Sequence, residues 1–222
     1  MCESILVVAV HPDDETLGCG GTLLRLREDG AEIHWLIVTS MTPEGGFSLD
    51  AIERRRLEIE AVTKMYGFAT VHCLGFTATR LDEIPMSQLV ASMSKVFQSV
   101  QPSQVFLPFQ HDVHSDHQYA FSAAYSCTKV FRYPSVRKVM MIETLSETDF
   151  AQSAGGGFVP NLFIDITNQF ERKMQILRMF ESELHPHPFP RSEESIKALA
   201  TLRGASAGCK YAESFMLLKE IA

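Results

Sequence analysis

Two short polar segments carry the residues that could do chemistry in this chain. The first runs from His11 to Glu15, reads His-Pro-Asp-Asp-Glu and directly follows the apolar segment 4–10. It places one imidazole and three carboxylates at the end of a predicted buried strand. Burying that much charge is unfavourable unless the charges are paired or bound to a cation. The segment therefore indicates a site for a divalent metal ion.

The second segment, 111–117, holds three histidines and two aspartates and also follows a predicted strand. Catalytic zinc usually takes three protein ligands from His, Asp and Glu and keeps one position open for water. The best ligand set spans both segments and consists of His11, Asp14 and His117. We expect one Zn²⁺ ion in each chain, although Fe²⁺, Co²⁺ or Mn²⁺ would also suit these nitrogen and oxygen ligands.

The other acids and imidazoles of the two segments suit proton transfer. A metal ion lowers the pKa of its bound water, and Asp13 is placed to take the proton. His114 could stabilise an oxyanion or protonate a leaving group, and Asp116 could orient that imidazole. A second metal ion, held with the help of His111 and Asp112, is the less favoured alternative and would suit phosphoester hydrolysis.

Short apolar runs alternate with helical patterns along the chain, which favours an α/β fold with a doubly wound, mostly parallel sheet. Nearly continuous apolar runs suit strands that are buried on both faces. Strands are predicted at 5–10, 33–38, 71–74, 105–108, 139–142 and 161–166. Helices are predicted at 22–29, 49–66, 86–100, 170–181 and 192–202. Ligands of such sheets bind at the carboxyl ends of the strands, so both charged segments should meet at one edge.

The composition indicates a single globular domain over residues 1–222, with 45% apolar and 21% charged residues. The net charge of −7 offers no basic face for a nucleic-acid backbone. The apolar segment 4–10 is too short for a signal peptide or a membrane span. Five cysteines, odd in number and far apart, favour a reduced, cytoplasmic setting and no thiolate metal site.

The two charged segments together resemble those of the PIG-L / LmbE-like family of zinc-dependent N-acetylglucosaminyl deacetylases. The resemblance rests on His-Pro-Asp-Asp-Glu at 11–15, Gly-Cys-Gly-Gly at 18–21 and His-Ser-Asp-His at 114–117. Further family-like pieces are Arg55 with Glu58, Phe-Ile-Asp-Ile at 163–166, Arg203 with Gly204, and Tyr-Ala-Glu-Ser-Phe at 211–215. Ser115 stands where proline is common in the family, and 40–47 differs from the thiol-sugar biosynthesis members.

This resemblance implies a Rossmann-like three-layer fold and hydrolysis of an N-acetyl group, usually from a glucosamine unit in a larger conjugate. It implies that His11, Asp14 and His117 bind the zinc ion. Asp13 would be the base for a zinc-bound water, and His114 the electrophilic partner. The expected partner is a small N-acylated amino sugar or glycoconjugate, and a homo-oligomer is compatible with the family.

Two arginines are candidates for substrate contact. Arg55 either turns inward to brace the first charged segment or lies on a solvated helix face. Arg203 either binds a phosphate or carboxylate of the substrate or, by default, forms a structural salt bridge. His185 and His187 flank prolines in a surface loop that could cover the pocket. The glycines at 18–21 are interpreted as close helix packing rather than as a dinucleotide site.

Two other functions stay open on the sequence alone. A metal-dependent amidase or deacylase acting on an antibiotic, a glycolipid or a thiol conjugate would use the same site with different substrate loops. A non-catalytic metal-binding protein could keep the fold, but the complete set of histidines and aspartates argues against it.

Overall fold

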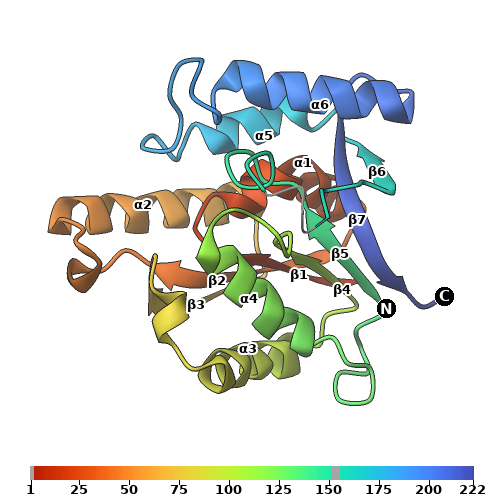
Figure 1. Ribbon diagram of the computed structural model, residues 1–222. Helices are drawn as coiled ribbons and strands as arrows, with labels where there is room; N and C mark the ends of the chain where they lie inside the picture. Colours follow the sequence, from red (N-terminus) through yellow and green to blue (C-terminus); the bar gives the residue numbers. More distant parts are fainter. Residues whose placement is uncertain (1–2, 152–155) are drawn as a thin grey trace.

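The computed structural model describes residues 3–151 and 156–222, which fold around a seven-stranded sheet (Figure 1). The strand order is β3-β2-β1-β4-β5-β7-β6. The first five of these strands run parallel, whereas β7 pairs antiparallel with both β5 and β6. The strands are β1 (Ser4–Ala9), β2 (Glu32–Ser40), β3 (Thr70–Thr77), β4 (Gln104–Leu107), β5 (Lys138–Ile142), β6 (Leu162–Asp165) and β7 (Ala212–Glu220). The mostly parallel α/β sheet that the sequence predicted is confirmed.

Helices cover both faces of the sheet, which gives three layers (Figure 1). One face carries α1 (Asp14–Glu28), α2 (Leu49–Tyr66), α5 (Phe170–Leu177) and α6 (Glu193–Ala207), and the other carries α3 (Met86–Val100) and α4 (Ser115–Ser126). Two short 3₁₀ turns, η1 (Pro43–Gly45) and η2 (Leu81–Glu83), lie in the connections. Alternate residues of β1 enter the two cores: Ile5 packs on the α1 side and Leu6 on the α3 side. Burial on both faces explains why the strand reads as a continuous apolar run.

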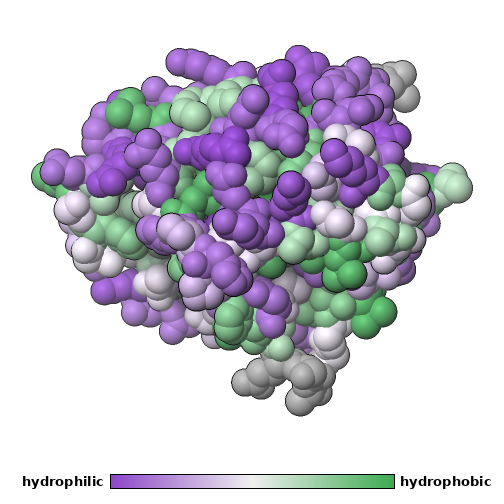
Figure 2. Space-filling model, turned by 90° about the horizontal axis from the view of Figure 1, so that it is seen from above, coloured by the Kyte–Doolittle hydropathy of each residue, from purple (hydrophilic) through white to green (hydrophobic). Residues whose placement is uncertain are grey.

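Helix α4 and strand β7 were not predicted from the sequence, and α1 begins at Asp14 instead of residue 22. The starts of α1 and α4 are rich in charged and polar residues, histidine and glycine, so they lack the apolar period that marks a helix. At the other end of the chain, α5 ends at Leu177, earlier than predicted, and α6 continues to Ala207. None of the helices within residues 3–151 and 156–222 has the length and apolar character needed to cross a membrane. The face of the molecule seen in Figure 2 mixes hydrophilic and hydrophobic residues.

Helix α1 is bent, and a buried ion pair holds the bend. Cys19 has a φ of −147°, outside the helical range. The amides of Gly21 and Thr22 donate to the Glu213 carboxylate of β7 at 2.9 and 2.7 Å. Lys173 of α5 pairs with the same carboxylate at 2.7 Å and also donates to a backbone carbonyl of α1. Because every charge in this buried group has partners, it ties α1, and the charged segment that starts it, to α5 and β7.

The glycines at 18–21 allow α1 to lie close to its neighbours. A Cβ atom on Gly18 would lie 2.7 Å from the side chain of Ile142, and one on Gly21 would lie 2.8 Å from Ile166. Contacts this short cannot be accommodated in a filled core without displacing side chains. Close helix packing therefore explains these glycines.

Replacing Gly21 with alanine should destabilise the protein, because the added methyl group overlaps Ile166. Overpacking of this kind typically lowers the free energy of unfolding by about 1–3 kcal/mol. Urea unfolding followed by circular dichroism measures the effect. Gly157→Ala is the matched control, since nothing lies within 4 Å of its Cβ position. Equal unfolding midpoints for the two variants would contradict the packing interpretation.

Candidate functional site

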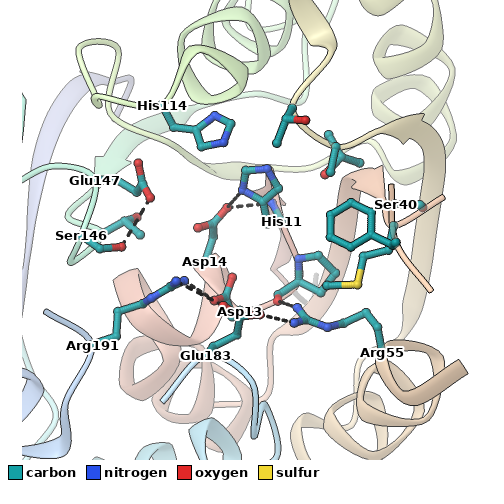
Figure 3. A pocket seen from close by; sticks show the side chains of 17 residues that line it. His11, Asp13, Asp14, Ser40, Arg55, His114, Ser146, Glu147, Glu183 and Arg191 are labelled. Atoms are coloured by element: carbon teal, nitrogen blue, oxygen red, sulfur yellow. Dashed lines mark hydrogen bonds and ion pairs between the residues drawn. The ribbon is translucent and has the colours of Figure 1, made fainter. Parts of the chain in front are cut away.

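The carboxyl ends of β1, β2 and β5 and the loop after β4 meet around a cavity of about 230 Å³ (Figure 3). The loop after β1 contributes His11, Asp13 and Asp14, and the loop after β4 contributes His114. The turn after β5 contributes a third group of polar residues, which includes Glu147. The two charged segments thus lie at one edge of the sheet, as their positions after parallel strands predicted.

His11, Asp14 and His117 bring their ligand atoms within 4.8 Å of one another. The Asp14 Oδ2 atom lies 3.4 Å from His117 Nε2 and 3.9 Å from His11 Nδ1. Ligand bonds of about 2.0–2.2 Å in a tetrahedral zinc site put neighbouring donor atoms roughly 3.4 Å apart. His117 Nε2 is buried and has no hydrogen-bond partner among the described residues. An orphaned imidazole nitrogen that faces a carboxylate is what a bound cation would satisfy, so these residues fit a metal ion.

The Asp14 carboxylate is held in place by the backbone. Its Oδ2 atom accepts hydrogen bonds from the amides of Val10 and His11 at 3.0 and 2.8 Å. These two hydrogen bonds fix the direction of the Asp14 carboxylate at the point where β1 ends.

Asp112 orients His117, a role that the sequence did not reveal. Its carboxylate lies 2.8 Å from His117 Nδ1 and accepts a hydrogen bond from the Thr148 hydroxyl at 2.6 Å. Burial alone would lower the pKa of His117, but Asp14 and Asp112 outweigh it and raise that pKa to about 9. A cation bound to Nε2 would take the place of this proton. From the sequence, Asp112 was expected only at a second metal ion, although metal-bound imidazoles usually pair with a carboxylate.

Asp116 contacts His11, and the prediction that its carboxylate orients His114 is wrong. The Asp116 carboxylate accepts hydrogen bonds from the amides of Thr79 and Leu81 at 2.6 and 3.0 Å and lies 3.4 Å from His11 Nε2. These hydrogen bonds outweigh burial and lower the pKa of Asp116. The partners of the Asp116 carboxylate are thus His11 and two backbone amides, which was not evident from spacing alone.

His114 is oriented by the backbone of α4 instead. Its Nδ1 accepts a hydrogen bond from the Asp116 amide at 3.1 Å and thereby caps the helix. In the neutral imidazole the proton then resides on Nε2, which becomes a donor. Burial lowers the pKa of His114, and this favours the neutral form. His114 also forms a second group of potential ligands with His11 and Asp116, but its Nδ1 and the Asp116 oxygens are already used in these hydrogen bonds.

Asp13 combines deep burial with an unusual backbone conformation. It precedes α1 with a φ of 141°, a region that residues other than glycine rarely adopt. The residue is 2% exposed, and its Oδ2 accepts a hydrogen bond from Arg191 Nη1 at 3.0 Å. Burial raises the pKa of Asp13 well above its usual range, Asp14 and Glu183 add to the rise, and Arg191 opposes it. Strained backbones and raised carboxyl pKa values gather at catalytic sites.

Arg55 turns inward, as one of the two sequence interpretations held. Its Nη1 donates to the carbonyl of Pro12 at 2.6 Å, and its Nη2 pairs with Glu183. Arg191 Nη2 lies 3.2 Å from the other oxygen of Glu183. Glu183 therefore bridges two arginines that hold successive residues of the first charged segment (Figure 3). No sequence signal pointed to Arg191 or Glu183, since both lie far along the chain.

The remaining candidates from the sequence, Arg203 and the two histidines of the 185–190 loop, do not line the cavity. Arg203 pairs with Glu143 through two contacts of 3.0 and 2.5 Å and is not among the residues that line the cavity. The structural salt bridge, its default interpretation, describes it better than a substrate contact. His185 and His187 are exposed and do not line the cavity, whereas Arg191, at the end of the same loop, does.

Replacing Asp112 with asparagine should weaken zinc binding about 10- to 100-fold, because the imidazole of His117 loses its anionic partner. Zinc titration against a chelator of known affinity measures the change. Asp29→Asn is the matched control, as Asp29 is exposed and lies at the far end of α1. Wild-type affinity in Asp112→Asn would show that Asp112 does not support the ligand.

Comparisons with known proteins indicate the family of this chain. Residues 6–128, more than half of the chain, match the family model PIG-L: GlcNAc-PI de-N-acetylase. The diacetylchitobiose deacetylase of Thermococcus kodakarensis is 27% identical over 99% of this chain and 84% of its own length. The Bacillus cereus protein named probable N-acetyl-alpha-D-glucosaminyl L-malate deacetylase 2 is also 27% identical, over 81% of this chain and 83% of its own length.

The fold is shared with solved structures. N,N'-diacetylchitobiose deacetylase from Pyrococcus horikoshii has a TM-score of 0.78 and 22% identity, with 97% of this chain and 83% of that chain covered. GalB, the 4-carboxy-2-hydroxymuconate hydratase of Pseudomonas putida, has a TM-score of 0.73 and 18% identity, with 99% and 98% covered. At these identities the two structures show a common fold alone. The family match over more than half of the sequence, in contrast, shows that this chain belongs to the PIG-L family.

Proposed function

We propose that this protein is a zinc-dependent hydrolase that removes the N-acetyl group from a substrate containing an amino sugar. The observation that carries the proposal is the group of His11, Asp14 and the orphaned Nε2 of His117. A buried carboxyl group and a neutral imidazole for proton transfer share the cavity with two of these ligands. The names of the T. kodakarensis and B. cereus relatives support the N-acetylated sugar as substrate class.

The residues of the chain divide the work around the reacting amide. When bound, a zinc ion would lower the pKa of a water molecule and polarise the amide carbonyl. Asp13 accepts the proton of the attacking water and delivers it to the amine nitrogen as the C–N bond breaks and acetate is released; its raised pKa suits both transfers. His114 donates from Nε2 to the carbonyl oxygen as negative charge develops there. Arg55 and Arg191 hold the backbone and the carboxylate of the segment that carries the base.

The fold does not select this reaction by itself, since a hydratase shares it. The main alternative is an amidase or deacylase that uses the same site on a substrate without a sugar. Acetate release from N-acetylglucosamine, diacetylchitobiose and a set of N-acetylated amines without a sugar ring separates the two. A preference for the sugars is expected, and a preference for the other amines would favour the alternative.

Asp13→Asn should lower kcat on the preferred substrate about 10²- to 10⁴-fold while zinc stays bound, because the base is lost but the ligands remain. Removal of the metal with a chelator should abolish acetate release, and zinc should restore it. Measurements are initial rates together with the metal content of each preparation. Asp29→Asn again serves as the control. Near-normal activity of Asp13→Asn would exclude Asp13 as the base.

Arg191→Gln should move the acid limb of the pH profile of kcat/KM to higher pH. Arg191 opposes the rise in the pKa of Asp13, so its removal lets that pKa rise further. Asp13 then becomes protonated at a higher pH, and activity that needs its ionised form is lost sooner as the pH falls. Arg191→Lys retains the charge and should shift the limb less. Superimposable profiles for all three proteins would contradict the coupling of Arg191 to the base.

A further inference from the structure

Glu147 is a cavity-lining acid that the proposed mechanism does not use. It follows β5 in a tight turn in which Ser146 adopts a left-handed φ of 75°. The Glu147 amide donates to the carbonyl of Thr144 at 3.2 Å, and its own carbonyl accepts a hydrogen bond from the Val113 amide at 3.2 Å. The Thr148 hydroxyl then donates to Asp112 at 2.6 Å. The turn is thus fastened, through the Glu147 carbonyl and Thr148, to the loop that carries His114 and the partner of His117.

The Glu147 carboxylate lacks donors. Its Oε2 is buried and has no hydrogen-bond partner among the described residues, and its Oε1 has only a long contact of 3.4 Å from the Ser146 hydroxyl. Burial raises the pKa of Glu147, and the nearby imidazoles of His117 and His11 oppose the rise. A buried acceptor without a partner is unfavourable unless a ligand brings a donor to it. In Figure 3 the carboxylate lies at the side of the cavity below His114, across from Ser40 and Arg55.

Glu147 is separate from the metal ligands. It belongs to neither of the two groups of described residues whose ligand atoms lie close enough to share an ion. The zinc site that we propose is therefore complete without it. What remains for this carboxylate is contact with the substrate.

The charged residues of the cavity indicate which substrate groups Glu147 can contact. Arg55 is paired with Glu183, and Arg191 with Glu183 and Asp13. Asp14 is assigned to the metal ion. Among the described acidic residues that line the cavity, Glu147 is then the one with neither a salt bridge nor a place in the proposed metal site. A subsite formed by an unpaired carboxylate binds hydroxyl or ammonium groups and repels phosphate and carboxylate groups.

We propose that Glu147 forms a subsite that accepts hydrogen bonds from the sugar part of the substrate and selects uncharged N-acetylated glycosides over anionic ones. This inference rests on the proposed deacetylase function and narrows it to one substrate class. It separates this chain from deacetylases whose sugar is joined to an acidic group, because such a group would lie against the Glu147 carboxylate, which has no salt bridge.

The test compares two substrates in three proteins. The substrates are diacetylchitobiose, which is uncharged, and N-acetylglucosamine 6-phosphate, which is anionic. The proteins are the wild type, Glu147→Gln and Glu44→Gln. Glu44 is an exposed carboxylate outside the cavity, so its variant serves as the matched control.

The wild type and Glu44→Gln should have a higher kcat/KM for diacetylchitobiose than for the phosphorylated sugar. Glu147→Gln should lower kcat/KM for diacetylchitobiose about 10- to 100-fold, mainly through KM, because a hydrogen bond to a charged acceptor is lost. It should also raise kcat/KM for the phosphorylated sugar.

Two further readouts keep the result interpretable. Zinc content and unfolding midpoint show whether Glu147→Gln is intact, and Glu147→Asp, which keeps the charge, should retain most of the preference. Calorimetry with glucosamine and glucosamine 6-phosphate on the zinc-loaded proteins reports the subsite without turnover, and Glu147→Gln should lose the discrimination between them.

The outcomes separate this inference from the proposed function. If the wild type releases no acetate from any sugar, the function fails, and calorimetry still decides whether Glu147 discriminates charge. If the wild type is active but Glu147→Gln keeps the same substrate ratio and the same discrimination in binding, the subsite assignment is overturned.

Discussion

The burial of charge at the end of β1 is the constraint on which the rest of this structure depends. Asp13 and Asp14 are 2% and 3% exposed, and each needs partners that water would otherwise supply. Backbone amides satisfy Asp14, and Arg191 satisfies Asp13. Arg191 is in turn balanced by Glu183, which also binds Arg55. The chain thus builds an alternating row of charges around a segment that would be unstable alone, and a cation at His117 would complete it.

Carboxylates that contact the far ring nitrogens of the two imidazoles fix the orientation of these candidate ligands. Asp112 contacts His117, and Asp116 contacts His11, so each imidazole has one nitrogen held by an acid and the other free to face Asp14. His114 differs because a backbone amide holds it, which leaves it a neutral donor. In the proposed mechanism the same residue type therefore serves as ligand or as electrophile according to the partner of its second nitrogen. The bent and anchored α1 keeps this arrangement attached to β7 and α5.

Much of the fold was predictable because parallel strands buried on both faces are continuous apolar runs, and β1 is such a run. The elements that were missed are those in which ligand residues and glycines replace the apolar period, at the start of α1 and in α4. Strand β7 was also missed. It carries Glu213, a charged residue that is buried because it pairs with Lys173, and this pairing is visible only once the chain is folded. The membership in the PIG-L family, which two short motifs indicated, is confirmed by a match over more than half of the chain.

The sequence by itself determined the residue types of the candidate metal site and their place at one edge of the sheet, because two polar segments directly follow buried parallel strands. Only the tertiary structure decided which atom faces which. The helical start of α4 directs Asp116 to His11, and the 111–117 loop directs Asp112 to His117. Arg191, Glu183 and Glu147 entered the site only through folding, since Arg191 and Asp13 are 178 positions apart. Spacing specifies neighbours along a strand or helix, whereas side-chain direction across such distances is set by the packing of the whole domain.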